Sequence, residues 1–185
     1  FKSNQNCLVC APSNSGKTVC AAFAILHMLT TNSDGKCVYV APSDVIADAT
    51  FSQLAALFGK ILRKSMILRL TGETAPDLEL LSAGKILVAS VRQWDMLSRR
   101  WRQRKAVQAV TLMIFDELHF LGGELGPTLE VVISRTRFMS SQIGKTDDSG
   151  IVVRIVGLSA SLANARDVGD WMGVPTKSLF NFSPK

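Results

Sequence analysis

The stretch Ala11-Pro12-Ser13-Asn14-Ser15-Gly16-Lys17-Thr18 decides the fold of this chain. The apolar run Cys7–Cys10 precedes it, and a segment with helical character, residues 19–29, follows it. A strand, a loop of small residues ending in Gly-Lys-Thr and a helix together form the arrangement of a phosphate-binding loop. The backbone N–H groups of such a loop surround a polyphosphate, and the N-terminus of the helix adds its positive end. The stretch predicts a nucleotide site, and the alternative is a surface loop that contains Gly-Lys-Thr.

Two side chains of this loop carry specific expectations. The ammonium of Lys17 is predicted to neutralise the β- and γ-phosphates, and the hydroxyl of Thr18 to coordinate Mg²⁺. The strict pattern has Gly at its first position, where this chain has Ala11. The predicted cofactors are therefore ATP and Mg²⁺, held by the whole loop from Ala11 to Thr18.

Chain length, composition and net charge limit the class of protein. A chain of 185 residues predicts one domain, residues 1–185, that is large enough to bury a core. Its 47% hydrophobic and 19% charged residues exclude a disordered chain. The net charge of +6 permits an anionic partner such as nucleic acid. No run reaches the ~18 apolar residues that a membrane span needs, so no membrane partner is expected.

Four cysteines are present, and two of them have a spacing that zinc sites use. Cys7 and Cys10 are three positions apart on a predicted strand, so their side chains face opposite sides of the sheet. No second Cys or His pair follows at a ligand spacing. All four cysteines are predicted to be reduced and buried rather than metal-bound.

Short apolar segments alternate with helical ones along the rest of the chain. Strands buried on both faces are continuous apolar runs, as in a parallel sheet, and alternating strands and helices predict an α/β fold with helices on both faces of a mostly parallel sheet. The polar segment 144–150 is predicted to be a surface loop. The predicted strands are Cys37–Ala41, 66–70, 86–89, 110–115 and 151–158, and the predicted helices are 44–62, 76–83, 94–107, 128–143 and 163–172.

The second stretch with chemical meaning is Asp116-Glu117-Leu118-His119, directly after the most apolar strand. A carboxylate at the end of a buried strand, beside a phosphate loop, can hold Mg²⁺ through water, and Asp116 is predicted to do so. Glu117 is predicted to orient or deprotonate the water that attacks the γ-phosphate. The alternative is a surface turn.

A third stretch, Ser159-Ala160-Ser161, follows the last long strand. Its hydroxyl groups can bond the neighbouring loop that contains His119, which would couple the two loops. A second reading, compatible with the first, is an N-cap for a helix that starts near Leu162.

Together these three stretches resemble motifs I, II and III of superfamily 2 helicases of the Asp-Glu-x-His type. Ala41-Pro42-Ser43 resembles motif Ia and Thr71-Gly72-Glu73 resembles motif Ib. Residues 94–104, 122–130, 140–143, 161–167 and 180–182 look like the superkiller-like group, and within it the C-terminal cassette of spliceosomal members that have two tandem cassettes. The likeness covers nearly the whole chain.

The resemblance implies a RecA-like P-loop fold and ATP-driven remodelling of small nuclear RNA pairing by a nuclear, spliceosomal helicase. It implies that Pro42, Ser43, Thr71 and Gly72 contact the RNA backbone. It also implies a second RecA-like domain, which supplies an arginine finger from outside residues 1–185, so that this chain alone hydrolyses ATP negligibly. Other spliceosomal proteins are the implied partners.

One basic segment could add phosphate contacts. Residues 99–105 combine Arg99 and Arg100 with an interleaved tryptophan, Trp101. The alternative is a solvated helix face with Trp101 packed inward, because charged runs usually face solvent.

Two departures from the family pattern leave two functions open. Asn14 stands where the family usually has Gly; asparagine tolerates a left-handed backbone, but its side chain crowds the phosphates. Ser90-Val91-Arg92-Gln93 replaces the usual Thr-Pro-Glu-Lys. The first function is the nucleotide-binding domain of an active helicase. The second is a degenerate cassette that serves as a regulatory, protein-binding platform.

Overall fold

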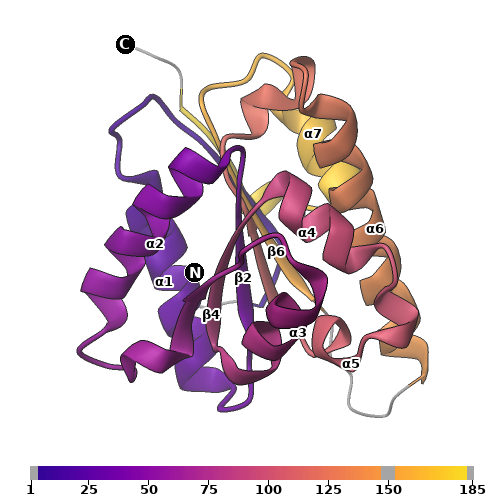
Figure 1. Cartoon of the computed structure of the whole chain (residues 1–185). Coiled ribbons are helices and arrows are strands. Elements are labelled where there is room, and N and C mark those ends of the chain that lie inside the picture. The colour runs from indigo at the N-terminus through magenta and orange to yellow at the C-terminus, as the bar shows by residue number, and fades with distance from the viewer. Residues whose placement is uncertain (1–3, 147–152, 183–185) are drawn as a thin grey trace.

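A computed structural model describes residues 4–146 and 153–182 of the chain. Seven parallel strands form one sheet, in the order β3-β4-β2-β5-β6-β1-β7. The sheet lies between two layers of helices (Figure 1). The strands are β1 Cys7–Cys10, β2 Cys37–Ala41, β3 Ile67–Arg69, β4 Ile86–Ser90, β5 Leu112–Phe115, β6 Arg154–Ser159 and β7 Leu179–Asn181.

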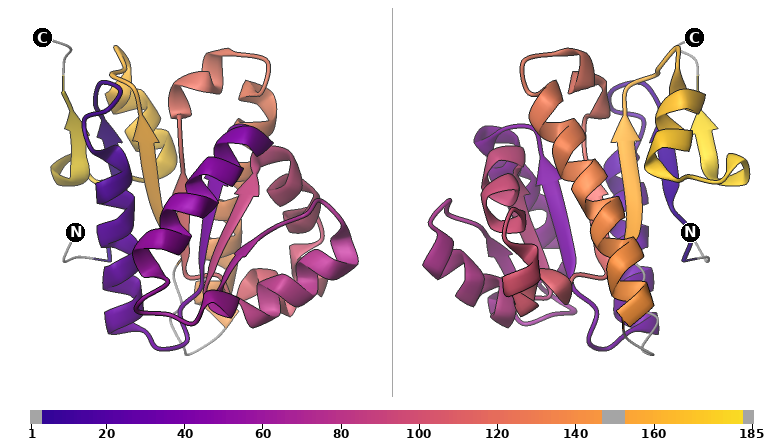
Figure 2. Two further views of the ribbon diagram at one scale, coloured as in Figure 1. Left: turned by 60° about the vertical axis from the view of Figure 1, so that its left-hand side comes forward. Right: turned by 90° about the vertical axis from the view of Figure 1, so that its right-hand side faces the viewer.

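Each face of the sheet is covered by its own set of helices. Helices α1 and α2 pack on one face, and α3 to α7 pack on the other. Figure 2 shows α6 running along the length of its face. The helices are α1 Lys17–Thr31, α2 Asp44–Phe58, α3 Thr74–Ala83, α4 Val91–Ser98, α5 Lys105–Gln108, α6 Gly126–Thr146 and α7 Ala165–Met172. Both predictions, the α/β class and helices on both faces, are confirmed.

Alternation of side chains along each strand divides the core. Leu8 and Cys10 of β1 point to the α3–α7 side, whereas Cys7 and Val9 point to the α1–α2 side. The prediction that Cys7 and Cys10 face opposite sides is therefore confirmed, and all four cysteines are free thiols. Three of them are buried, while Cys20 is only half-buried, and burial raises the pKa of Cys10 to about 11.

The predicted helix 94–107 is wrong as a single element. Helix α4 already starts at Val91 and stops at Ser98, and a short 3-10 turn, Trp101–Gln103, and α5 follow. The guanidinium of Arg104 donates to the carbonyls of Met96 and Leu97, which satisfies oxygens at the end of α4. This break turns Trp101 toward the core, against which its ring packs.

The remaining differences lie at element ends and at the last strand. Strand β7 was not predicted; it pairs with β1 through Leu179, Phe180 and Asn181. The predicted loop 144–150 is in part wrong, because α6 continues to Thr146, and its residues 147–150 lie outside the described part of the chain. The same holds for residues 151 and 152 of the predicted strand 151–158.

Candidate nucleotide-binding site

The loop Ala11–Thr18 lies between β1 and α1, at the carboxyl edge of the sheet. Two of its residues have left-handed backbones, Asn14 with φ 60° and Gly16 with φ 89°. At Gly16, the N-cap of α1, a side chain would be strained because L residues rarely adopt this φ. The expectation that Asn14 accepts a left-handed conformation is confirmed. These two residues let the backbone turn from β1 into the first turn of α1.

The ammonium of Lys17 spans its own loop. Its Nζ donates to the carbonyl oxygens of Ala11 at 2.9 Å and of Pro12 at 3.0 Å. The Ala11 N–H in turn donates to the Ser159 carbonyl at 3.0 Å, which fixes the loop to the end of β6. A polyphosphate would compete with the two carbonyls for the Lys17 charge. A cavity of about 260 Å³ adjoins the loop and is lined by Val9, Ala11, Pro12, Ser15, Lys17, Cys20 and Phe182.

The side chain of Asp116, at the end of β5, is held on both oxygens. Tyr39 of β2 donates its hydroxyl to Oδ2 at 2.5 Å, and the Glu117 N–H donates to Oδ1 at 2.8 Å. Burial, and after it the Asp116 charge, raises the pKa of Tyr39 well above its ordinary value, so the phenol remains a proton donor. The carboxylate of Asp116 is therefore held in one orientation by these two hydrogen bonds.

Glu117 has a left-handed backbone, with φ 52°. A non-glycine residue in this region is held there by its surroundings, and such strain is concentrated at functional positions. Its side chain is 30% exposed, and its Oε2 lies 3.2 Å from Nδ1 of His119. The turn thus presents a carboxylate to solvent at the edge where the loop Ala11–Thr18 ends.

His119, the last residue of the second stretch, lies beside the third stretch. The Ala160 N–H points at Nδ1 of His119 over 3.4 Å. The same nitrogen also lies 3.2 Å from Oε2 of Glu117, so the His119 ring stands between the acidic turn and the loop after β6. The third stretch therefore meets His119 through the backbone N–H of Ala160, whereas the prediction that its serine hydroxyl groups bond this loop is wrong: Ser161 donates to the Phe182 carbonyl, and Ser159 Oγ has no partner among the described residues.

The N-cap reading of Ser159–Ser161 is wrong. Helix α7 starts at Ala165, and its N-cap is Asn164, whose side chain makes no cap hydrogen bond. The Oγ of Ser159 is buried and, among the described residues, lacks a hydrogen-bond partner. The serines therefore have no part in starting α7.

The oxygen atoms at this edge fit a magnesium ion. Mg²⁺ takes oxygen ligands and keeps several waters, so one hydroxyl and one carboxylate acting through water are sufficient. Thr18 is exposed at the start of α1, and each Asp116 oxygen has a second lone pair beyond its hydrogen bond. Within residues 4–146 and 153–182, no group of three or more His, Cys, Asp or Glu side chains could hold a metal on its own.

The residues predicted to bind RNA fall into two groups. Pro42 and Ser43 follow β2, and Thr71 and Gly72 lie just after β3, so both pairs are at the carboxyl edge. Because β3, β4 and β2 are neighbours, these two loops flank the half of the edge that does not carry the phosphate loop. Ser43 is the N-cap of α2, with its Oγ accepting from the Ile46 N–H.

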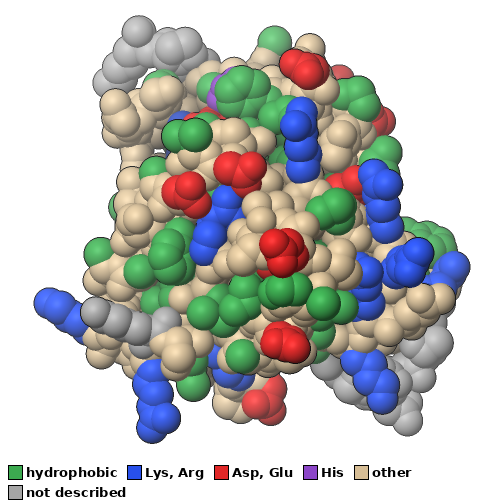
Figure 3. Space-filling model, in the orientation of Figure 1, with side chains coloured by type: hydrophobic (Ala, Val, Ile, Leu, Met, Phe, Trp, Pro, Cys, Tyr) green, Lys and Arg blue, Asp and Glu red, His purple; other side chains and the backbone are tan. Residues whose placement is uncertain are grey.

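Arg99 and Arg100 are not brought to that edge. Helix α4 starts at the carboxyl edge and runs back across the sheet, and both arginines follow its last residue. Arg99 pairs with Asp95, and Arg102 lies 5.2 Å from the ring centre of Trp101. Lys and Arg side chains gather along the right-hand side of the face in Figure 3, near α4 and α5.

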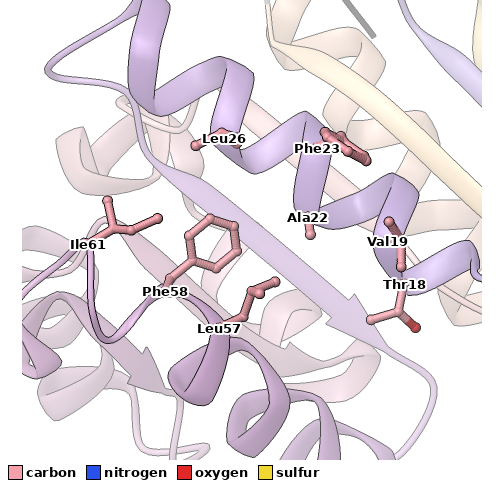
Figure 4. A pocket seen from close by; sticks show the side chains of 8 residues that line it. All are labelled: Thr18, Val19, Ala22, Phe23, Leu26, Leu57, Phe58 and Ile61. Atoms are coloured by element: carbon pink, nitrogen blue, oxygen red, sulfur yellow. The ribbon is translucent and has the colours of Figure 1, made fainter.

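Sequence reasoning missed several residues that hold the site. Tyr39 and Arg69 lie inside predicted strands, and Asp77 lies in a predicted helix, where their types carry no signal of a role. It also missed an apolar pocket of about 300 Å³ between α1 and the end of α2. Figure 4 shows Phe23 and Leu26 of α1 on one side of it and Leu57, Phe58 and Ile61 on the other.

The sheet, the loop and the acidic turn at its carboxyl edge define a RecA-like P-loop domain. The sequence pattern of "DEAD/DEAH box helicase" matches residues 1–168. The chain therefore belongs to the DEAD/DEAH box helicase family.

Curated relatives match across the whole chain. The U5 small nuclear ribonucleoprotein 200 kDa helicase of Homo sapiens is 48% identical over 184 residues. Pre-mRNA-splicing factor brr2 of Schizosaccharomyces pombe is 42% identical over 185 residues. Each alignment covers 100% of this chain but 8% of the relative. The chain thus spans a small part of the length of these relatives.

Solved structures agree on the fold. The DUF1998 helicase MrfA bound to DNA and AMPPNP is 20% identical with a TM-score of 0.75, covering 96% of this chain and 25% of that chain. The Pyrococcus furiosus Hef helicase domain is 22% identical with a TM-score of 0.70, covering 96% of this chain and 34% of that chain.

Among the helices of the described residues, none is long and apolar enough to cross a membrane.

Proposed function

We propose that residues 1–185 are the first RecA-like domain of an ATP-dependent RNA helicase that remodels small nuclear RNA pairing in the nuclear spliceosome. The observation that carries the proposal is the convergence of three loops at one sheet edge. The Ala11 N–H bonds to Ser159, and Ala160 contacts His119 of the acidic turn. Identity of 48% to a U5 small nuclear ribonucleoprotein helicase supports the spliceosomal role.

We assign the chemistry to four side chains. Lys17 leaves its loop carbonyls to neutralise the β- and γ-phosphates of ATP, while the backbone of Ala11–Thr18 surrounds them. Thr18 and, through water, Asp116 hold Mg²⁺, which when bound offsets the charge that develops on the phosphates. Glu117 orients and deprotonates the attacking water.

His119, Ser159, Ala160 and Ser161 couple the acidic turn of the nucleotide site to the loop after β6. The contact from the Ala160 N–H to His119 is the supporting feature, because any shift of the acidic turn acts on the end of β6. Ser161 extends the connection to Phe182, beside β7.

The RNA backbone lies along the loops after β2 and β3, against Pro42, Ser43, Thr71 and Gly72. Thr71 is exposed, and Gly72, with φ 97°, leaves room for a phosphate to approach the backbone. Arg99 and Arg100 are at the far end of α4, so on this domain they fit a separate phosphate contact rather than the same RNA path. The partners of the domain are a second RecA-like domain and other spliceosomal proteins.

The platform alternative has less support. It rests on Asn14 and on the altered block Ser90–Gln93, yet Asn14 adopts the left-handed turn of the loop, and Lys17, Thr18, Asp116 and Glu117 are all present. The helicase names of the relatives point the same way.

The decisive experiment measures ATP turnover by the full-length protein, with and without single-stranded RNA. We expect RNA-stimulated turnover that Lys17→Ala removes. We expect the isolated 185-residue chain to turn over ATP negligibly, since an arginine finger in trans contributes ~10³–10⁵ in rate. Unchanged RNA-stimulated turnover in the Lys17→Ala protein, with hydrolysis supplied by the other cassette, would favour the platform instead.

A further inference from the structure

Arg69, the last residue of β3, has its guanidinium bonded to the protein through all three of its nitrogen atoms. Its Nε donates to Oδ1 of Asp48 at 2.8 Å, and its Nη2 donates to Oδ1 of Asp44 at 2.8 Å. Its Nη1 donates to the Leu70 carbonyl at 2.7 Å and also to Oε1 of Gln93. Its side chain is only 16% exposed, while those of Asp44 and Asp48 are 65% and 70% exposed.

These contacts join the two loops of the proposed RNA path. Asp44 directly follows Ser43, and Leu70 directly precedes Thr71. A single guanidinium is therefore bonded to the neighbour of each loop. Its donors have a fixed planar geometry, so it sets a defined distance between the groups that it bonds.

We call Arg69 and the side chains that it bonds, Asp44, Asp48 and Gln93, the Arg69 frame. Gln93 connects this frame to the block Ser90–Gln93, which departs from the family pattern. Its Oε1 accepts from the Ser90 N–H at 2.9 Å as well as from Arg69. The frame therefore spans the ends of β3, β4 and β2, which are neighbours in the sheet.

Asp77 of α3 holds the loop Thr71–Gly72 from the inside. It is buried, with 1% of its surface exposed. It accepts from the N–H and hydroxyl of Thr71 at 2.7 and 2.9 Å and from the Gly72 N–H at 2.9 Å. The turn after β3 is thus fixed from inside by Asp77 and from its start by Arg69.

We propose that Arg69 is a positioning residue for RNA: through Asp44 and Asp48 it sets the spacing between the loops Pro42–Ser43 and Thr71–Gly72, and it does not itself contact phosphate. The inference rests on the proposed function, in which those loops bind the RNA backbone. Every donor direction of the guanidinium except part of Nη2 is turned toward a protein acceptor, which leaves a phosphate little to bond.

A direct phosphate-binding role for Arg69 predicts the opposite effect on RNA affinity when the carboxylates of Asp44 and Asp48 are removed. If Arg69 were a phosphate ligand, Asp44 and Asp48 would compete with RNA for it and would also repel phosphates. Removing both carboxylates would then strengthen RNA binding. If Arg69 sets loop spacing, removing them weakens binding even though two negative charges are lost.

The test measures the affinity of the full-length protein for a short fluorescein-labelled oligouridylate by anisotropy. The variants are Asp44→Ala with Asp48→Ala, and Arg69→Lys, which keeps the charge but not the planar set of donors. Glu79→Ala is the matched control, an exposed carboxylate on α3 that makes no hydrogen bond or ion pair among the described residues. Thermal unfolding and ATP affinity verify that each variant is folded.

We expect the double variant and Arg69→Lys each to lower RNA affinity about tenfold, with Glu79→Ala no weaker than the unmodified protein. Unchanged or stronger binding by the double variant, or full affinity in Arg69→Lys, overturns the inference. Ser43→Glu tests the proposed RNA path separately from the role of Arg69, since it places a negative charge on that path. If Ser43→Glu leaves RNA affinity intact, the proposed RNA path fails; if it weakens binding while the Arg69 frame variants do not, only the frame is wrong.

Discussion

The hydroxyl of Tyr39 donates a hydrogen bond of 2.5 Å to Oδ2 of Asp116. The two residues are 77 positions apart in the sequence: Tyr39 belongs to β2, where it is paired with Ile114 of the neighbouring parallel strand β5, and Asp116 directly follows β5. Tyr39 is 1% exposed, so its phenol is fixed by the core on one side and by the carboxylate on the other. The orientation of the predicted magnesium-holding carboxylate is therefore set from inside the sheet.

Replacing this tyrosine tests its effect on the metal. We expect Tyr39→Phe to weaken binding of ATP–Mg²⁺ several-fold, by about 1 kcal/mol, because Asp116 loses its orienting hydrogen bond. Binding of ATP without Mg²⁺ is expected to stay the same. Calorimetric titration with and without Mg²⁺ separates the two, and equal losses in both titrations would show a general effect on the fold.

A second prediction concerns Glu117 in the full-length protein. We expect Glu117→Gln to abolish the ATP turnover of the cassette that contains this domain while ATP–Mg²⁺ binding there is largely kept, because Lys17, Thr18 and Asp116 remain. The amide preserves the size of the side chain at this left-handed position and removes only the base. Turnover is measured by phosphate release and affinity by calorimetry. Should affinity fall as far as the rate, Glu117 acts in binding rather than in the chemical step.

A third prediction concerns the unusual residue of the phosphate loop. We expect Asn14→Gly to tighten ATP–Mg²⁺ binding several-fold, by about 1 kcal/mol. Glycine adopts the observed φ of 60° without strain and removes a side chain that crowds the phosphates, at some cost in loop order. Ser13→Gly is the control, since it adds flexibility one residue away. Equal or weaker binding by Asn14→Gly would mean that asparagine is tolerated or useful there.

A fourth prediction concerns stability in acid. The carboxylate of Asp95, 7% exposed, is bonded by Arg99 and by Arg135, whose Nη1 lies at 2.9 Å. Burial on its own raises the pKa of Asp95, but the hydrogen bonds of the two arginines outweigh it, so the pKa lies below its usual 3.8. A carboxyl group with a lowered folded pKa stabilises the fold above its unfolded pKa, and this contribution is lost as pH falls through the folded value.

Asp95→Asn should therefore be destabilised at pH 7 and lose less stability than the unmodified chain between about pH 4 and lower pH. Urea unfolding at several pH values measures this. Glu79→Gln serves as the control and should leave the pH profile unchanged. A parallel profile for Asp95→Asn would show that the two arginines stabilise the fold without depending on the charge of Asp95.

The sequence determined the fold class and the positions of the two main chemical stretches. Continuous apolar runs such as Cys37–Ala41 indicate buried parallel strands because both faces of the sheet are covered. The Gly-Lys-Thr loop and the Asp-Glu turn are short, local patterns at strand ends. Carboxyl ends of parallel strands share one edge, so the meeting of these loops was predictable from the sequence.

Tertiary structure decided what holds these loops and where the helices break. Helix α4 stops at Ser98, where the Arg104 side chain satisfies carbonyls near the helix end, a contact that helical periodicity does not encode. Strand β7 was missed because it has only three residues, of which Leu179 is half-buried and Phe180 and Asn181 are exposed, so it carries almost no pattern. Tyr39 bonds Asp116, and Arg69 bonds Asp44 and Asp48, only because the strand order β3-β4-β2-β5 brings these elements together. Such contacts depend on strand order and side-chain direction, which residues distant in sequence acquire only when the sheet has formed.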